Sequence, residues 1–204
     1  MGAGNVVEGK RPWGLLAQRD FRLLWLGETT SSLGNTVTTV VMPLTAVTLL
    51  GANPLAVGVL NAAAWLPWLV IGLPAGAWVD RLCRRPIMLA ADFVSLALFA
   101  GIPVAAWLGV LSLPLLMVVA LLGGTASVFF STAYRALLPS LVAREDLLEG
   151  NSKLQGSEQG ARIAGRGLGG LLAQLLGPAT ALFVDAARLS TVSGLFWEIR
   201  FSGP

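Results

Sequence analysis

Four charged side chains lie within six positions of the segment GLPAGAWVDRLCRRP, residues 72–86: Asp80, Arg81, Arg84 and Arg85. The segment separates two long apolar stretches in a chain of which only 12% of the residues are charged. An aspartate at a helix start accepts hydrogen bonds from free backbone N–H groups, and arginines beside a carboxylate can hold packed helices together. We expect this turn to act as a latch between helices; charges that only set topology are the alternative.

Isolated polar residues inside the apolar stretches are the second group of candidates. Glu28 is the best candidate for proton coupling or cation recognition, because a carboxylic acid in an apolar site can exchange protons near neutral pH. A structural hydrogen bond to a neighbouring helix is an equal alternative for Glu28. Asn35, two turns further, is a candidate for a polar wall, and Asp185 is a candidate of the same site. Asp92 is expected to join the network of the charged turn.

Aromatic residues could supply an apolar binding surface, because aromatic faces bind cations and flat rings. The candidates are Trp65, Trp68 and Phe99, although packing is the commoner role for such residues. Histidine is absent and Cys83 is the only cysteine. This excludes an intrachain disulfide, a Cys/His zinc site and a Ser–His or Cys–His nucleophile pair. We expect neither an enzyme nor a bound metal or cofactor.

The composition indicates an all-α integral membrane protein. The chain is 55% hydrophobic with a mean hydropathy of +0.73, whereas about one quarter of a soluble domain is charged. A spanning helix needs about 20 mostly apolar residues. Six transmembrane helices are predicted, of which the last two are weaker because each contains charge. They cover roughly residues 22–49, 55–79, 86–109, 113–136, 155–176 and 178–199.

The distribution of basic residues predicts the orientation of these helices in the bilayer. The connections near residues 51–54, 110–113 and 176–178 carry no charge, whereas the alternate connections carry nearly all of the lysines and arginines. Basic residues favour the cytoplasmic side, so both termini are expected there. The basic charge then fixes topology, and we expect no nucleic-acid partner.

The predicted organisation is a single six-helix domain with short cytoplasmic ends. Its parts are a cytoplasmic N-terminal segment 1–21, a transmembrane domain 22–199 and a cytoplasmic tail 200–204. The longest connection, 137–155, alternates leucines with charges. It is expected to be an amphipathic helix on the inner membrane surface, with a solvated connector as the equal alternative.

The charged turn resembles a known family signature. Gly76 and the four charges have the spacing G-x-x-x-D-R-x-x-R-R, which is similar to the loop signature of the major facilitator superfamily (MFS) at the same place in the topology. The family usually has Gly where Cys83 stands. The stretches FRLLWLGETTSSLGNTVTTVVMPL, FFSTAYRALLPSLV and NSKLQGSEQ also resemble bacterial drug-efflux members of the macrolide-efflux or enterobactin-exporter type.

The resemblance implies a transporter half. MFS members have two six-helix halves, each a 3+3 inverted repeat, with the site between the halves. It therefore implies an N-terminal half in the bacterial inner membrane that exports small amphipathic molecules in exchange for protons. The half would pair with itself or with a second half. The alternative is a truncated, non-transporting remnant, or an interaction subunit of a full-length transporter.

Small residues repeat along the predicted fifth helix, which allows close helix packing. Gly165 and Gly169 are the main packing candidates, and Gly72 with Gly76 forms a similar face in the second helix. The two stripes of the fifth helix are Gly156, Gly160 and Ala164, and Ala161, Gly165, Gly169 and Ala173. Arg166 stands where the family signature has Pro, which predicts a charge near the membrane midplane and a defect in the helix.

Overall fold

The computed structural model describes residues 14–79, 84–142 and 146–177, and these ranges contain helices and short connections without any strand. The elements are η1 (Gly14–Ala17), α1 (Arg19–Leu50), α2 (Pro54–Val70), α3 (Gly72–Val79), α4 (Arg84–Trp107), α5 (Leu113–Leu141) and α6 (Leu147–Leu176). The prediction of an all-α fold is confirmed for the described residues.

The turn between α1 and α2 follows directly from its sequence, GANP. Gly51 ends α1 with φ 60°, a backbone conformation that glycine adopts readily. The N–H groups of Gly51 and Ala52 donate to the carbonyls of Val47 and Ala46. Asn53 caps α2 by accepting a hydrogen bond from the backbone N–H of Ala56 at 2.8 Å, and Pro54 is the first helical residue.

The described helices provide three to four membrane spans. Three helical stretches are long and apolar enough to cross a bilayer: Phe21–Leu50, Pro86–Trp107 and Leu113–Ala136. The α2–α3 pair passes as a fourth if it is one bent span. The prediction of six spans is therefore supported only in part. The helix α6 contains the predicted fifth segment but does not reach the same apolarity, and the predicted sixth segment, 178–199, lies outside the described residues.

The predicted second span is broken. Between α2 and α3 the axis bends by 49° at Ile71. Pro74 lacks the N–H that would bond to the Val70 carbonyl in a continuous helix, and its ring would crowd that carbonyl. Gly72, beside the break, adds backbone freedom. The hydrophobic pattern alone does not reveal this bend, because the apolar run continues across it.

The segment between α5 and α6 also differs from its prediction. We expected a separate surface helix or connector over 137–155, but α5 extends to Leu141 and α6 already begins at Leu147. Helical segments that protrude beyond the apolar spans thus replace most of the predicted loop. Residues 143–145 lie outside the described residues.

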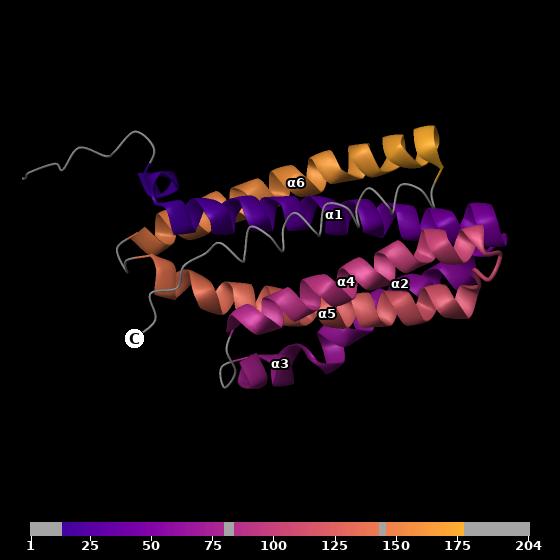
Figure 1. Ribbon diagram of the computed structural model, residues 1–204, viewed down its shortest axis with the longest axis horizontal. Helices are drawn as coiled ribbons and strands as arrows, with labels where there is room; N and C mark the ends of the chain where they lie inside the picture. The colour runs from indigo at the N-terminus through magenta and orange to yellow at the C-terminus, as the bar shows by residue number, and fades with distance from the viewer. Residues whose placement is uncertain (1–13, 80–83, 143–145, 178–204) are drawn as a thin grey trace, which may run out of the picture.

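The helices form two layers (Figure 1): α6 runs along α1, while α5 packs against α2 and α4. Glycines allow the closest approaches. A Cβ at Gly165 of α6 would lie 2.9 Å from both the carbonyl oxygen of Leu33 and Cβ of Thr36 on α1. A Cβ at Gly124 of α5 would clash with the carbonyl oxygen of Ala64 on α2. Backbones this close are typical of helix pairs in membranes.

Two apolar clusters hold the two ends of the bundle. One joins Phe21 and Leu24 of α1 to Met88 of α4 and to the C-terminal part of α5. The other joins Val41 of α1 to Leu60 of α2 and to the N-terminal part of α5. Because α1 and α5 contribute opposite ends to each cluster, these two helices run antiparallel, and the space between the clusters lies mid-bundle.

The outward surface of the described bundle is strongly apolar. Leu69, Leu73 and Trp107 are 82%, 90% and 87% exposed, respectively. Large apolar side chains at this exposure are unfavourable in water and suit contact with lipid. The described helices therefore place their apolar surface outside and their polar groups within.

Candidate functional site

A cavity of about 450 Å³ lies between the two layers. Its wall comes from α1, α2, α5 and α6, with Phe99 as the contribution of α4. This volume lies within the range of small-molecule sites in proteins, about 300–1,000 Å³. The cavity is lined by charged and hydroxyl groups in some parts and by aromatic rings in others, so its wall is amphipathic.

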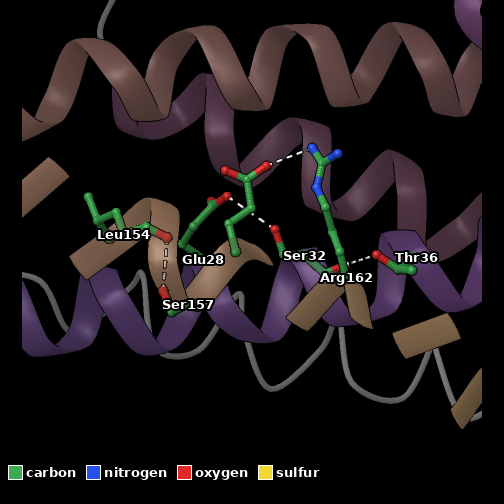
Figure 2. A network of polar contacts seen from close by, with 7 residues as sticks. Glu28, Ser32, Thr36, Leu154, Ser157 and Arg162 are labelled. Atoms are coloured by element: carbon green, nitrogen blue, oxygen red, sulfur yellow. Dashed lines mark hydrogen bonds and ion pairs between the residues drawn. The ribbon is translucent and has the colours of Figure 1, made fainter. Parts of the chain in front are cut away.

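Glu28 of α1 lines the cavity and has an incomplete set of hydrogen-bond partners. Its Oε1 accepts a hydrogen bond from the Ser32 hydroxyl at 3.5 Å (Figure 2). Its Oε2 is buried and has no hydrogen-bond partner among the described residues. Glu158, Arg135 and Asp92 lie close enough to act on this carboxyl group electrostatically. A carboxyl oxygen left open in this way can accept a proton or a cationic group.

The helix α6 lines the cavity with charge. Glu158 and Arg162 form an ion pair of 2.7 Å across one helical turn, and Arg166 follows one turn further. Arg135 of α5 lines the same space. Neither Arg166 nor Arg135 forms an ion pair or hydrogen bond within the described part of the chain. The cavity therefore holds two carboxylates and three guanidinium groups.

The contacts between helices fix the order of these groups along the cavity. Since Gly165 packs on Leu33 and Thr36, and Gly169 on Val37, the helices α1 and α6 run parallel. Arg166 then stands at the level of Asn35, and Glu158 at the level of Glu28. The two levels are two helical turns apart, about 10 Å.

Three aromatic rings of the wall lie away from the carboxylates. Trp65 and Trp68 of α2 and Phe99 of α4 line the cavity. They lie near Gly123 and Gly124, where α5 contacts Phe99 and α2. Three turns of α5, about 16 Å, separate this level from Arg135, which lies close to Glu28. Arg166 and these aromatic rings thus both lie away from the level of the carboxylates.

The structure brings together only some of the residues that the sequence singles out. Glu28 and Asn35 share the cavity wall with the three aromatic residues. Asp92 is only 3% exposed and does not line the cavity, but it lies close enough to Glu28 to act on it electrostatically. Asp185 lies outside the described residues.

Little of the predicted latch can be placed. Asp80 and Arg81 lie outside the described residues, as do the side chains of Arg84 and Arg85 at the start of α4. A Cβ at Gly72 or Gly76 would meet no atom of the described residues within 4 Å. The close packing expected at these two glycines is therefore not present within the described part of the bundle.

The sequence pattern alone missed the charged wall of α6. Glu158 is not among the sequence candidates, and Arg135 and Arg162 resemble the topology-setting charges of a cytoplasmic connection because they lie near the ends of the connection 137–155. The available signal was the spacing of Glu158, Arg162 and Arg166, which puts all three on one helix face. That face lies beside the small-residue stripe that packs on α1.

A bundle with an apolar exterior and a charged central cavity is the architecture of a membrane transporter. Comparison with known proteins agrees: the sequence model of the transmembrane secretion effector family matches residues 10–202. The chain belongs to this family of the major facilitator superfamily, which confirms the resemblance found in the sequence. Membership of a transporter family also supports a role other than catalysis.

Three relatives are transporters of the major facilitator superfamily, and two of them are named as multidrug efflux pumps. The chain is 31% identical over 156 residues to an uncharacterised MFS-type transporter of Mycobacterium bovis, covering 75% of this chain and 35% of the relative. It is 31% identical over 169 residues to the multidrug efflux pump Tap of Mycolicibacterium fortuitum, covering 80% and 41%. It is 32% identical over 136 residues to Tap of Mycobacterium tuberculosis, covering 63% and 32%. The chain thus spans less than half the length of the curated relatives it matches.

Proposed function

We propose that this chain forms the N-terminal half of an exporter in the bacterial inner membrane, which moves small amphipathic molecules outward in exchange for protons. Residues 178–199 would supply a sixth span that completes a 3+3 repeat with both termini cytoplasmic. The observation that carries the proposal is the buried, incompletely bonded Glu28 carboxyl beside a 450 Å³ amphipathic cavity. Two relatives are multidrug efflux pumps, which supports the direction of transport.

Exchange follows from competition for one carboxyl group. Glu28 can hold either a proton or the cationic part of a substrate, and binding of one displaces the other. If the carboxyl group faces the two sides of the membrane in turn, inward proton movement drives substrate outward. The second half of the transporter, either another copy of this chain or a separate polypeptide, would close the cavity and form its opposite wall.

The test is gradient-driven dye movement in everted bacterial membrane vesicles that contain this chain. We expect Glu28→Gln to abolish the part of dye movement that a protonophore stops. Glu149→Gln is the matched control, because Glu149 is an exposed carboxylate of α6 that pairs with Lys153 at 3.0 Å away from the cavity. Gradient-dependent movement that survives Glu28→Gln at the wild-type rate would contradict the role of Glu28.

Pairing is tested by the same assay in two forms. Two differently tagged copies of the chain are expressed together, and, separately, the chain is fused to the C-terminal half of Tap from Mycolicibacterium fortuitum. Co-purification of the two tags with dye movement supports self-pairing. Movement by the fusion alone supports pairing with a different half. Absence of dye movement from both the co-expressed copies and the fusion, each shown to be inserted in the membrane, would overturn the exporter proposal.

The charged turn is proposed as the latch that stabilises one state of the transport cycle, through Gly76, Asp80, Arg81, Arg84 and Arg85. We expect Asp80→Ala to lower the transport rate while the protein remains inserted, because the arginines lose their carboxylate partner. Asp80→Glu, which keeps the charge, is the control. Equal transport by Asp80→Ala and wild type would reduce the turn to a topology signal.

A further inference from the structure

The cavity wall presents three kinds of surface: carboxylates, a guanidinium group and aromatic rings. At one level lie the carboxylates of Glu28 and Glu158. Arg166 lies about 10 Å further, toward the part of the wall that holds the rings of Trp65 and Trp68. An apolar molecule would leave these charges without partners, which is unfavourable in a confined space. The wall therefore favours a ligand that carries charged groups as well as an apolar part.

The charges at the two levels differ in their remaining binding capacity. Glu158 is already paired with Arg162, whereas Glu28 Oε2 has no hydrogen-bond partner among the described residues. Arg166 is exposed on the wall and forms no ion pair within the described helices. One open acceptor and one open guanidinium group thus face the same cavity. A ligand that carries both an ammonium and an acid group could satisfy both.

We propose that the cavity binds zwitterionic amphiphiles in one orientation, with the ring system against Trp65 and Trp68, the acid on Arg166 and the ammonium on Glu28. This specificity rests on the proposed function only in treating the cavity as the substrate site. The planar guanidinium suits a carboxylate, to which it can donate two parallel hydrogen bonds. The ammonium would compete with the proton for Glu28, which is compatible with exchange.

Three fluorescent probes with one ring system separate the charges. Nα-dansyl-lysine carries the ring, an acid near it and an ammonium at its far end. Dansyl-norleucine lacks the ammonium, and dansylcadaverine lacks the acid. Binding to the purified full chain is measured by energy transfer from tryptophan to the dansyl group. We expect Nα-dansyl-lysine to bind about tenfold more tightly than either single-charge probe, since hydrogen bonds to charged groups are among the strongest.

The variants assign each charge to its residue. Arg166→Gln should weaken the binding of Nα-dansyl-lysine and of dansyl-norleucine about tenfold and leave the binding of dansylcadaverine unchanged. Glu28→Gln should weaken the binding of Nα-dansyl-lysine and of dansylcadaverine and leave the binding of dansyl-norleucine unchanged. Arg22→Gln is the control, because Arg22 is exposed on α1 and does not line the cavity. The wild-type order of the three probes decides the proposal even if a variant fails to fold.

The outcomes separate this inference from the proposed function. Equal affinity for the three probes, or a preference that Arg166→Gln leaves intact, overturns the zwitterion site, even where vesicles show proton-driven dye movement. A zwitterion preference that depends on both charged residues supports the site even where no dye movement occurs, and in that case the exporter proposal alone fails.

Discussion

Buried polar groups without partners are few in the described bundle, and two of them lie close together. The Tyr134 hydroxyl is buried without a hydrogen-bond partner among the described residues, and its ring is stacked on Phe130 with centroids 6.4 Å apart. Glu28 is close enough to act on it electrostatically. A membrane protein retains such groups where they serve a site, because each one is expensive in an apolar environment.

The Tyr134 hydroxyl and ring are expected to have opposite effects on stability. Tyr134→Phe removes a buried hydroxyl without a hydrogen-bond partner. The free energy of unfolding should stay unchanged or rise by up to about 1 kcal/mol, so the thermal unfolding midpoint in detergent should not fall. Tyr134→Leu also removes the stacked ring and should lower the midpoint. Equal losses from both variants would mean that the hydroxyl has a partner beyond the described residues.

The cavity wall could be predicted from sequence where a residue is unusual in its surroundings or carries a large aromatic ring. Glu28 and Asn35 interrupt an apolar run, and the structure places both on the cavity wall. Arg162 is not unusual beside a charged connection, so its position on the wall depends on how far α6 extends before the apolar part begins. Contacts between distant segments, such as Gly165 with Leu33, decide that question, and hydropathy does not contain them.

At the scale of elements, α6 shows how one helix serves two purposes. Its stripe of Ala161, Gly165, Gly169 and Ala173 is buried, whereas the other predicted stripe, with Gly156 and Gly160, is exposed. Packing on α1 therefore uses only one of the two stripes that the sequence offers. The charged face beside it is directed to the cavity, so the same helix supplies close packing and a polar wall.

This division predicts a contrast between two glycines of α6. Gly165→Ala places a Cβ 2.9 Å from Leu33 and Thr36 of α1, so the helices must separate, at a cost of about 1–3 kcal/mol. Gly160→Ala has no described atom within 4 Å and should be neutral or slightly stabilising. Thermal unfolding midpoints of the two variants in detergent give the comparison. Indistinguishable midpoints would argue against close α1–α6 packing.

Connections were predictable where a few residues determine them locally. Gly51, Asn53 and Pro54 encode the α1–α2 turn through a helix end, a cap and a first helical residue. The bend at Ile71 was not predicted, because the apolar run continues across it. The helical ends of α5 and α6 were not predicted, because their charged residues resemble those of a loop. Periodicity identifies faces better than it identifies ends.

At the scale of the whole molecule, the charges of α6 are tolerable only beside water. A charged side chain at a bilayer centre costs about 2.5–3.5 kcal/mol on insertion scales. Glu158, Arg162 and Arg166 line the cavity, where water can solvate them. The Arg166 position, which looks like a defect in a lipid-facing helix, is thus compatible with stable packing if the cavity is wet.

Water in the cavity is testable by thiol labelling in membranes. In a Cys83→Ser background, which removes the only cysteine, Asn61→Cys and Val59→Cys provide a matched pair on α2. Asn61 lines the cavity, whereas Val59 is 47% exposed but does not line it. The two positions differ by only about 3 Å in depth, so reagent access should depend on the face of the helix.

A membrane-impermeant maleimide should label Asn61→Cys in intact membranes and label Val59→Cys only after detergent is added. A zwitterionic probe bound in the cavity should slow the labelling of Asn61→Cys and leave the labelling of Val59→Cys unchanged. Equal labelling at both positions would mean that the outer face of α2 is not covered by lipid. Absence of labelling at Asn61→Cys would mean that the cavity excludes water, and the charges of α6 would then need partners beyond the described residues.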